Sequence, residues 1–250
     1  MTLILSVVMK SVFFLFFIKL VAYLLANGIN SIKTLLILSA GSSIVIGCFG
    51  ALFQKKIKRI LAYSSINNIG YMLIGLSVDS TVGIKTSIMY SFFYFIAVLI
   101  LFMVILNSKE IDEDGNSINA IVYTSDLHKL KNSKILLSIF ILTLFSLAGI
   151  PPLSGFFIKF FILKEAIFSK MYALAIIGAF SSVISAFYYI NLVKLTLFDK
   201  NEIKKLEKTD NSYLILLTLL SLSLGAIFVF PQNIEEFFYF LAKIVAYPYS

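Results

Sequence analysis

The chain of 250 residues has no tryptophan, one cysteine, one histidine and only four prolines. The single cysteine, Cys48, excludes an intramolecular disulfide and leaves no set of thiolates for a metal cluster. Neither a G-x-G-x-x-G motif nor a P-loop occurs, so we expect no flavin, nucleotide or iron–sulfur cluster in this chain. The lone histidine, His128, stands in a polar stretch and is expected to lie in a solvated loop.

Apolar residues, by contrast, are abundant: 60% of the chain is hydrophobic and the mean hydropathy is +0.97. Both values far exceed those of soluble domains and are typical of an integral membrane protein. We therefore predict an all-α polytopic membrane protein, with a membrane domain at residues 1–230 and a tail at residues 231–250. Seven transmembrane helices are predicted, at Thr2–Leu25, Thr34–Phe53, Ile60–Val78, Thr86–Asn107, Lys134–Ser169, Met171–Phe198 and Ser212–Phe230.

Cationic residues are unevenly distributed between the predicted connections. The connections at residues 54–59, 108–134 and 199–210 carry twelve lysines and arginines, whereas those on the opposite side carry four. Cytoplasmic loops of membrane proteins are enriched in such residues. The three cationic connections and the N-terminus, here called side A, are therefore predicted to face the cytoplasm or its organellar equivalent. This orientation accounts for the net charge of +8, and no nucleic-acid partner is expected.

The fifth predicted span is unusual because it contains Gly149-Ile150-Pro151-Pro152 and, beyond that, Lys159. As one helix it would be about 50 Å long, whereas the hydrocarbon core is about 30 Å thick. Pro151 and Pro152 lack amide donors and clash with the preceding turn. We therefore predict two half-helices joined inside protein or beside water. A lysine at mid-membrane costs roughly 2.5–3.5 kcal/mol, so the break and the lysine together indicate an ion path. A proline kink with a snorkelling lysine is the alternative.

Two further lysines lie inside the first predicted span. Lys10 and Lys19 are nine residues apart, which is about two and a half helical turns, so they point in opposite directions. We expect Lys10 to face a polar interior and Lys19 to reach toward the far side of the membrane, side B. Burial disfavours the charged form of lysine, so a buried lysine can exchange a proton near neutral pH, which arginine cannot. Polar groups of the third span could bridge two such lysines, although they also bond neighbouring helices; they are Tyr63, Ser64, Ser65, Asn67, Asn68 and Tyr71.

The tail at residues 231–250 is expected to form an interfacial helix. Asn233 is predicted to cap this helix, with Glu236 three residues later completing a capping box. The apolar residues that follow recur at helical spacing and would share one face, which lies in the membrane interface or packs against a partner subunit. They are Phe237, Phe240, Leu241, Ile244 and Val245.

Three stretches resemble the motifs of a known family. Residues 58–72 read KRILAYSSINNIGYM and resemble K-R-x-L-A-Y-S-S-I-x-H-x-G-Y-x. Residues 145–160 read FSLAGIPPLSGFFIKF and resemble F-S-L-A-G-I-P-P-x-x-G-F-x-x-K-F, the most specific of the three. Residues 5–10, LSVVMK, are similar to L-S-V-x-S-K. These motifs belong to the antiporter-like subunits of respiratory complex I, and the resemblance is strongest to the family of NADH dehydrogenase subunit 2.

The resemblance implies roles for individual residues. It places Lys159 on the second broken helix of the family, near the outlet of a proton path, and Lys10 on a central hydrophilic axis. Lys19 stands where a basic residue is frequent, whereas Asn68 stands where the family often has a histidine. Family members begin with further spans, including a first broken helix with a lysine and another helix with a glutamate. We expect a separate chain, from a split mitochondrial gene, to supply that N-terminal half; a fragment is the alternative.

The implied function is that of a membrane-arm subunit of NADH:ubiquinone oxidoreductase, which moves protons from side A to side B under the drive of distant quinone reduction. No cofactor is expected in this chain, because FMN, iron–sulfur clusters and ubiquinone would belong to other subunits. Expected partners are other membrane-arm subunits, the chain with the N-terminal half, and lipids. The expected location is the mitochondrial inner membrane, or a bacterial plasma membrane. A subunit of a multi-subunit cation/proton antiporter and a structural, non-pumping component are the alternatives.

Overall fold

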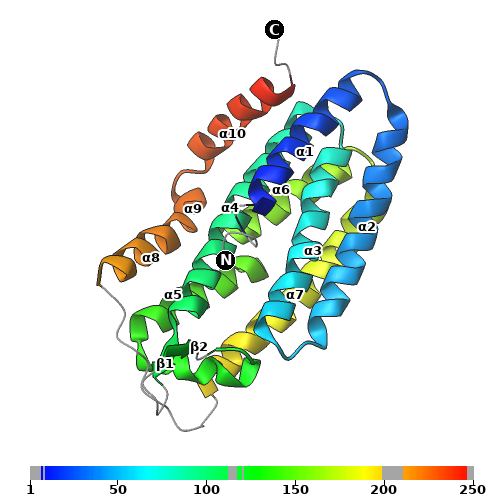
Figure 1. Ribbon diagram of the computed structural model, residues 1–250. Coiled ribbons are helices and arrows are strands. Elements are labelled where there is room, and N and C mark those ends of the chain that lie inside the picture. Colours follow the sequence, from blue (N-terminus) through cyan, green and yellow to red (C-terminus); the bar gives the residue numbers. More distant parts are fainter. Residues whose placement is uncertain (1–6, 8, 112–116, 120, 199–210, 247–250) are drawn as a thin grey trace.

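The protein is a bundle of long helices with a small two-stranded sheet at one end (Figure 1). The computed structural model describes residues 7, 9–111, 117–119, 121–198 and 211–246. The predicted start of the first span, residues 112–116 of the 108–134 connection and the link at residues 199–210 therefore lie outside the described residues. The elements are α1 (Met9–Ala26), α2 (Asn30–Leu52), α3 (Ile57–Ser77), α4 (Thr81–Asn107), β1 (Lys109–Ile111), β2 (Ser117–Asn119), the 3-10 helix η2 (Thr124–Asn132), α5 (Lys134–Ala148), α6 (Ser154–Phe168), α7 (Tyr172–Phe198), α8 (Asn211–Ser223), α9 (Ala226–Val229) and α10 (Pro231–Ala246).

Four of the described helices, α1, α2, α4 and α7, are long and apolar enough to cross a membrane by length and composition. Near-continuous apolar sequence favours helices in lipid, because a helix satisfies its own backbone polar groups. Of the most apolar stretch of α4, 78% is buried, against 22% for α1. Helix α4 is therefore the centre of the bundle, while α8, α9 and α10 follow one another along one side of it (Figure 1).

The predicted break in the fifth span is confirmed. Helix α5 ends at Ala148, and Gly149 follows with left-handed backbone angles (φ 85°, ψ 40°) that suit a glycine after a helix. Helix α6 begins at Ser154, after Pro151 and Pro152, whose peptide bond is cis. The two half-helices are thus separate elements.

The predicted continuous helix at Ser212–Phe230 is wrong, because the chain turns at Leu224 and Gly225 between α8 and α9. The buried carbonyl of Leu224 accepts a hydrogen bond of 2.8 Å from the backbone N–H of Ser154. Ser154 opens α6, and the first N–H groups of a helix have no partner within that helix. The turn therefore caps the second half of the broken span, which a continuous α8 would not do.

The 108–133 connection is more ordered than predicted. Strands β1 and β2 pair antiparallel, and η2 packs against α5 and α7. The expectation that His128 is solvated is wrong: it is buried in η2, and its Nδ1 lies 2.6 Å from the carbonyl of Ser125. The N–H of Thr124 donates to the carbonyl of Lys55 over 2.9 Å, so two of the predicted side-A connections lie at the same end of the bundle.

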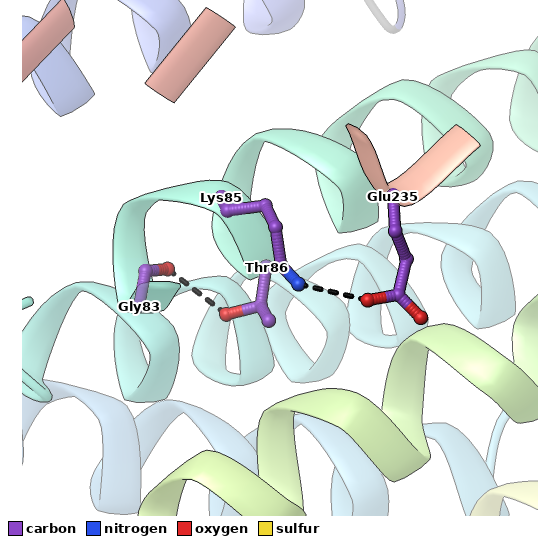
Figure 2. A network of polar contacts seen from close by, with 4 residues as sticks. All are labelled: Gly83, Lys85, Thr86 and Glu235. Carbon is purple, nitrogen blue, oxygen red and sulfur yellow. Dashed lines mark hydrogen bonds and ion pairs between the residues drawn. The ribbon is translucent and has the colours of Figure 1, made fainter. Parts of the chain in front are cut away.

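Helix α10 begins at Pro231, so the prediction that Asn233 caps it is wrong. Proline suits the first turn of a helix, where its missing N–H would have no partner. An ion pair of 3.0 Å joins Glu235, one turn further along α10, to Lys85 of α4 (Figure 2).

The predicted apolar face of α10 is split between two directions. Phe238 is buried, and its ring lies 5.5 Å from that of Phe92 and 6.3 Å from that of Phe93. Leu241 and Val245 pack beside the core, whereas three residues of the predicted face point outward and are exposed: Phe237, Phe240 and Ile244. Helix α10 thus binds α4 with one side only.

Candidate functional site

Lys159 of α6 is the most deeply buried lysine among the described residues, with 6% of its surface exposed. Its Nζ donates to the carbonyl oxygens of Leu147 and Ala148, at 3.0 and 3.3 Å, and to Ser185 Oγ at 3.3 Å. The last carbonyls of a helix have no partner within it and carry the negative end of the helix dipole. The break in the span therefore creates an oxygen-lined position for an ammonium group at the end of α5.

Close contact between the two half-helices depends on Gly155. A Cβ atom at this position would lie 1.6 Å from the carbonyl oxygen of Ser146. Beside it, the hydroxyls of Ser146 and Ser154 are 3.2 Å apart. Only a glycine allows α6 to start this close to the end of α5, and this approach brings Lys159 within reach of the free carbonyls.

Tyr71 of α3 covers the other side of the ammonium group. The Lys159 Nζ lies 5.7 Å from the centroid of the Tyr71 ring, close enough for a cation–π interaction. The Tyr71 hydroxyl donates to the carbonyl of Gly178 at 2.5 Å and lies 2.7 Å from Ser181 Oγ. Tyr71 thus joins α3 to α7 and presents its ring to the lysine.

Asn68, one turn before Tyr71, is also buried. Its Nδ2 donates to the carbonyl of Ser64 at 2.7 Å, and its Oδ1 accepts from the hydroxyl of Tyr90 at 2.6 Å. The Tyr90 ring stacks on that of Tyr71, with the ring centroids 5.8 Å apart. A polar cluster from α3, α4, α6 and α7 therefore surrounds Lys159 in the middle of an apolar bundle.

Lys10 approaches the same helix from α1. It is half-buried, and its Nζ donates to Ser65 Oγ at 3.1 Å. The hydroxyl of the neighbouring Ser64 donates back to the carbonyl of Leu61 at 2.9 Å. Lys19 is exposed on α1. The structure thus places Lys10 at Ser65 and Lys159 at Tyr71, both on α3, and leaves Lys19 exposed.

Some predicted site residues do not join this cluster. Tyr63 packs its ring against Gly50 on the α2 side of α3. Pro151 and Pro152 are exposed at the break, after the end of α5. The amide of Asn67 is fully buried at the α2 contact, beside Gly47, and has no hydrogen-bond partner among the described residues.

Several buried polar residues were missed from the sequence. A polar stripe of α7 follows helical spacing, and a tyrosine pair of α4 is four residues apart in an otherwise apolar span. Polar residues that recur at helical spacing in apolar helices are expected to share one face, and this pattern could have identified them. The residues are Tyr90, Tyr94, Ser181, Ser185, Tyr188 and Tyr189.

A small cavity adjoins the cluster. It is lined by Asn68, Tyr90 and Lys159 among others, and has a volume of about 10 Å³ measured as room for the centre of a water molecule. That is about the room one water needs. Among the described residues no three His, Cys, Asp or Glu side chains lie close enough together to hold a metal ion. The groups present can donate, accept and exchange protons.

Comparison with known proteins places this arrangement in a family. A family model described as "NADH:quinone oxidoreductase/Mrp antiporter, TM" matches residues 1–185. The chain is 38% identical over 238 residues to NADH-quinone oxidoreductase subunit N of Pelagibacter ubique, which covers 94% of this chain and 49% of that relative. It is 36% identical over 193 residues to NADH-ubiquinone oxidoreductase chain 2 of Marchantia polymorpha, which covers 76% of this chain and 38% of that relative.

A solved structure shows the same fold. A chain of respiratory complex I from Thermus thermophilus with bound aureothin superposes with a TM-score of 0.70 at 25% identity, over 81% of this chain and 45% of that one. The chain thus spans about half the length of the curated relatives and of the structure that it matches.

Proposed function

The chain belongs to the NADH:quinone oxidoreductase/Mrp antiporter family of transmembrane subunits, and we propose that it carries protons through the membrane arm of a NADH:quinone oxidoreductase. The observation that carries this proposal is the position of Lys159 at the broken helix. Its contacts are two carbonyls, one hydroxyl and one aromatic face, with no carboxylate among them. An ammonium held by dipoles alone can lose its proton without leaving a buried anion unpaired.

Lys10 and Lys159 are the two proton-exchanging groups in this proposal. A lysine can release a proton when it is desolvated, whereas an arginine stays charged. Lys10 is half-buried beside Ser65, and Lys159 is fully enclosed. Protons would pass from side A by way of Lys10 to Lys159 and leave toward side B, driven by quinone reduction elsewhere in the complex.

The finer assignments belong to the same proposal. We place seven membrane crossings at α1, α2, α3, α4, α5 with α6, α7, and α8 with α9, within a membrane domain at residues 1–230. Helix α10, in the tail at residues 231–250, would lie at the membrane interface. The chain would work with other membrane-arm subunits and with a separate chain that supplies the N-terminal half, in the mitochondrial inner membrane. FMN, iron–sulfur clusters and ubiquinone would be held by those other subunits.

A cation/proton antiporter subunit is the second candidate, because the description of the matching family names both classes. A structural, non-pumping subunit is the third. Co-purification from gently solubilised membranes separates the first two: a quinone-reducing NADH dehydrogenase supports the proposal, and an assembly of antiporter subunits alone contradicts it.

Replacing Lys159 with methionine separates pumping from a structural role. The assembled complex with Lys159→Met is expected to lose proton transport in reconstituted vesicles. The matched control is Lys194→Met, because Lys194 is an exposed lysine of α7. Unchanged proton transport in an assembled Lys159→Met complex would contradict the proposal.

A further inference from the structure

Two tyrosine hydroxyls are buried next to the lysine site without a hydrogen bond. Tyr188 and Tyr189 of α7 are 4% and 1% exposed, and their rings are 4.5 Å apart. Neither hydroxyl has a hydrogen-bond partner in the described part of the chain. Buried polar groups in native proteins are nearly always paired, with protein or with internal water. The two hydroxyls therefore have hydrogen-bonding capacity that internal water would satisfy.

The two tyrosines stand near groups that contact the lysines or neighbour those contacts. Ser185, which accepts the hydrogen bond of Lys159, is one helical turn before Tyr188 and Tyr189. The Tyr189 hydroxyl is close to the side chains of Ser64 and Asn68 of α3, yet it makes no well-aligned hydrogen bond with either of them. Water often bridges buried polar groups that are not aligned for a direct hydrogen bond.

On α3, the groups near Tyr189 are next to the contact of Lys10. Ser64 is followed by Ser65, whose hydroxyl accepts the hydrogen bond of Lys10. Tyr94 of α4 lies close to this same Ser65. The hydroxyl groups of α3, α4 and α7 thus form a series from Lys10 to Lys159. Direct hydrogen bonds are missing from this series at Tyr188 and Tyr189.

We propose that Tyr188 and Tyr189 hold internal water that connects Ser64 and Ser65, beside Lys10, with Ser185, beside Lys159. This inference rests on the proposed function and names the groups that join its two lysines. A water or hydroxyl oxygen accepts a proton on one lone pair and releases its own proton to the next oxygen. Each group is unchanged after the passage, so no further reactant is needed. The amide of Asn68 does not titrate; it orients the hydroxyl of Tyr90 and stays outside the series.

The test removes the hydroxyls and keeps the rings. In the assembled complex, the double variant Tyr188→Phe with Tyr189→Phe is expected to lower proton transport per quinone reduced by roughly 100-fold or more, the scale of a lost proton-transfer group. Tyr172→Phe is the matched control, because Tyr172 is an exposed tyrosine on the same helix. A wild-type density map at a resolution that shows waters should contain ordered water at hydrogen-bond distance from both hydroxyls.

Two results would overturn the inference: full proton transport in the double variant, or a map in which both hydroxyls bond to protein groups with no water between them. The Lys159→Met complex separates this failure from that of the proposed function. If Lys159→Met abolishes transport while the double variant keeps it, the proton takes another route and the proposed function stands. If both variants keep transport, the proposed function fails as well.

Discussion

Lys159 Nζ and the carbonyl oxygen of Leu147 are joined by a hydrogen bond of 3.0 Å, so a side chain of α6 occupies the end of α5. This bond links the two halves of one interrupted span across the break. It exists because Gly149 ends α5 in a left-handed conformation and leaves the Leu147 and Ala148 carbonyls free. The backbone interruption and the buried lysine are therefore a single feature.

Gly155→Ala is expected to disrupt this feature. The added Cβ would stand 1.6 Å from the Ser146 carbonyl oxygen, so α6 must move away from α5. Overpacking of this kind costs about 1–3 kcal/mol or more. Thermal unfolding of the complex should occur at a lower temperature, with proton transport reduced. The matched control is Gly225→Ala, since a Cβ there would meet its nearest neighbour, the Leu222 carbonyl oxygen, at an ordinary contact distance of 3.5 Å. Equal stability of the two variants would contradict the packing argument.

Tyr90→Phe is expected to leave the Oδ1 of Asn68 without its donor. Tyr90 is 1% exposed and its hydroxyl bonds Asn68 at 2.6 Å. An acceptor left unpaired in a buried position costs about 1–3 kcal/mol. The free energy of unfolding of the complex should fall by that amount in denaturant titrations. Tyr23→Phe, at an exposed tyrosine of α1, should change it little. A Tyr90→Phe complex as stable as the wild type would show that Asn68 finds another donor.

The ion pair between Lys85 and Glu235 is expected to hold α10 on α4 (Figure 2). Both side chains are partly exposed, so the coupling free energy should be modest, about 0.2–1 kcal/mol, and smaller at high salt. Lys85→Glu or Glu235→Lys alone should speed hydrogen exchange of α10 amides. The charge-swapped pair, carrying both changes, should restore slow exchange. Exchange in the single variants as slow as in the wild type would mean that Phe238 and Ala242 hold α10 without the ion pair.

Parts of this structure were predictable from the sequence, because they follow from local chemistry. Two adjacent prolines after a glycine end a helix wherever they stand, so the break between α5 and α6 was predicted to within a few residues. Lys159 stands seven residues past the prolines, with apolar residues on both sides. Its burial therefore follows from the apolar sequence that flanks it.

Apart from the cap of α10, the errors concern contacts between distant segments. The turn at Leu224 depends on an unpaired N–H of Ser154, which is 70 residues away in the chain. Burial of His128 depends on the packing of η2 against α7. The tyrosines of α4 and α7 were not predicted as site residues, because tyrosine is common in apolar membrane spans. Only the fold brings Tyr90, Tyr188 and Tyr189 to the side of the lysines.

Proton transport by the assembled complex carrying Lys159→Arg tests the central claim most directly. Arginine keeps the positive charge and the hydrogen bonds to α5, but it does not release a proton near neutral pH. If Lys159 exchanges a proton during each cycle, vesicles with this variant should show NADH-driven proton uptake reduced well below that of the wild type and of Lys194→Arg. Proton uptake equal to the wild type would show that Lys159 serves only as a fixed charge at the broken helix.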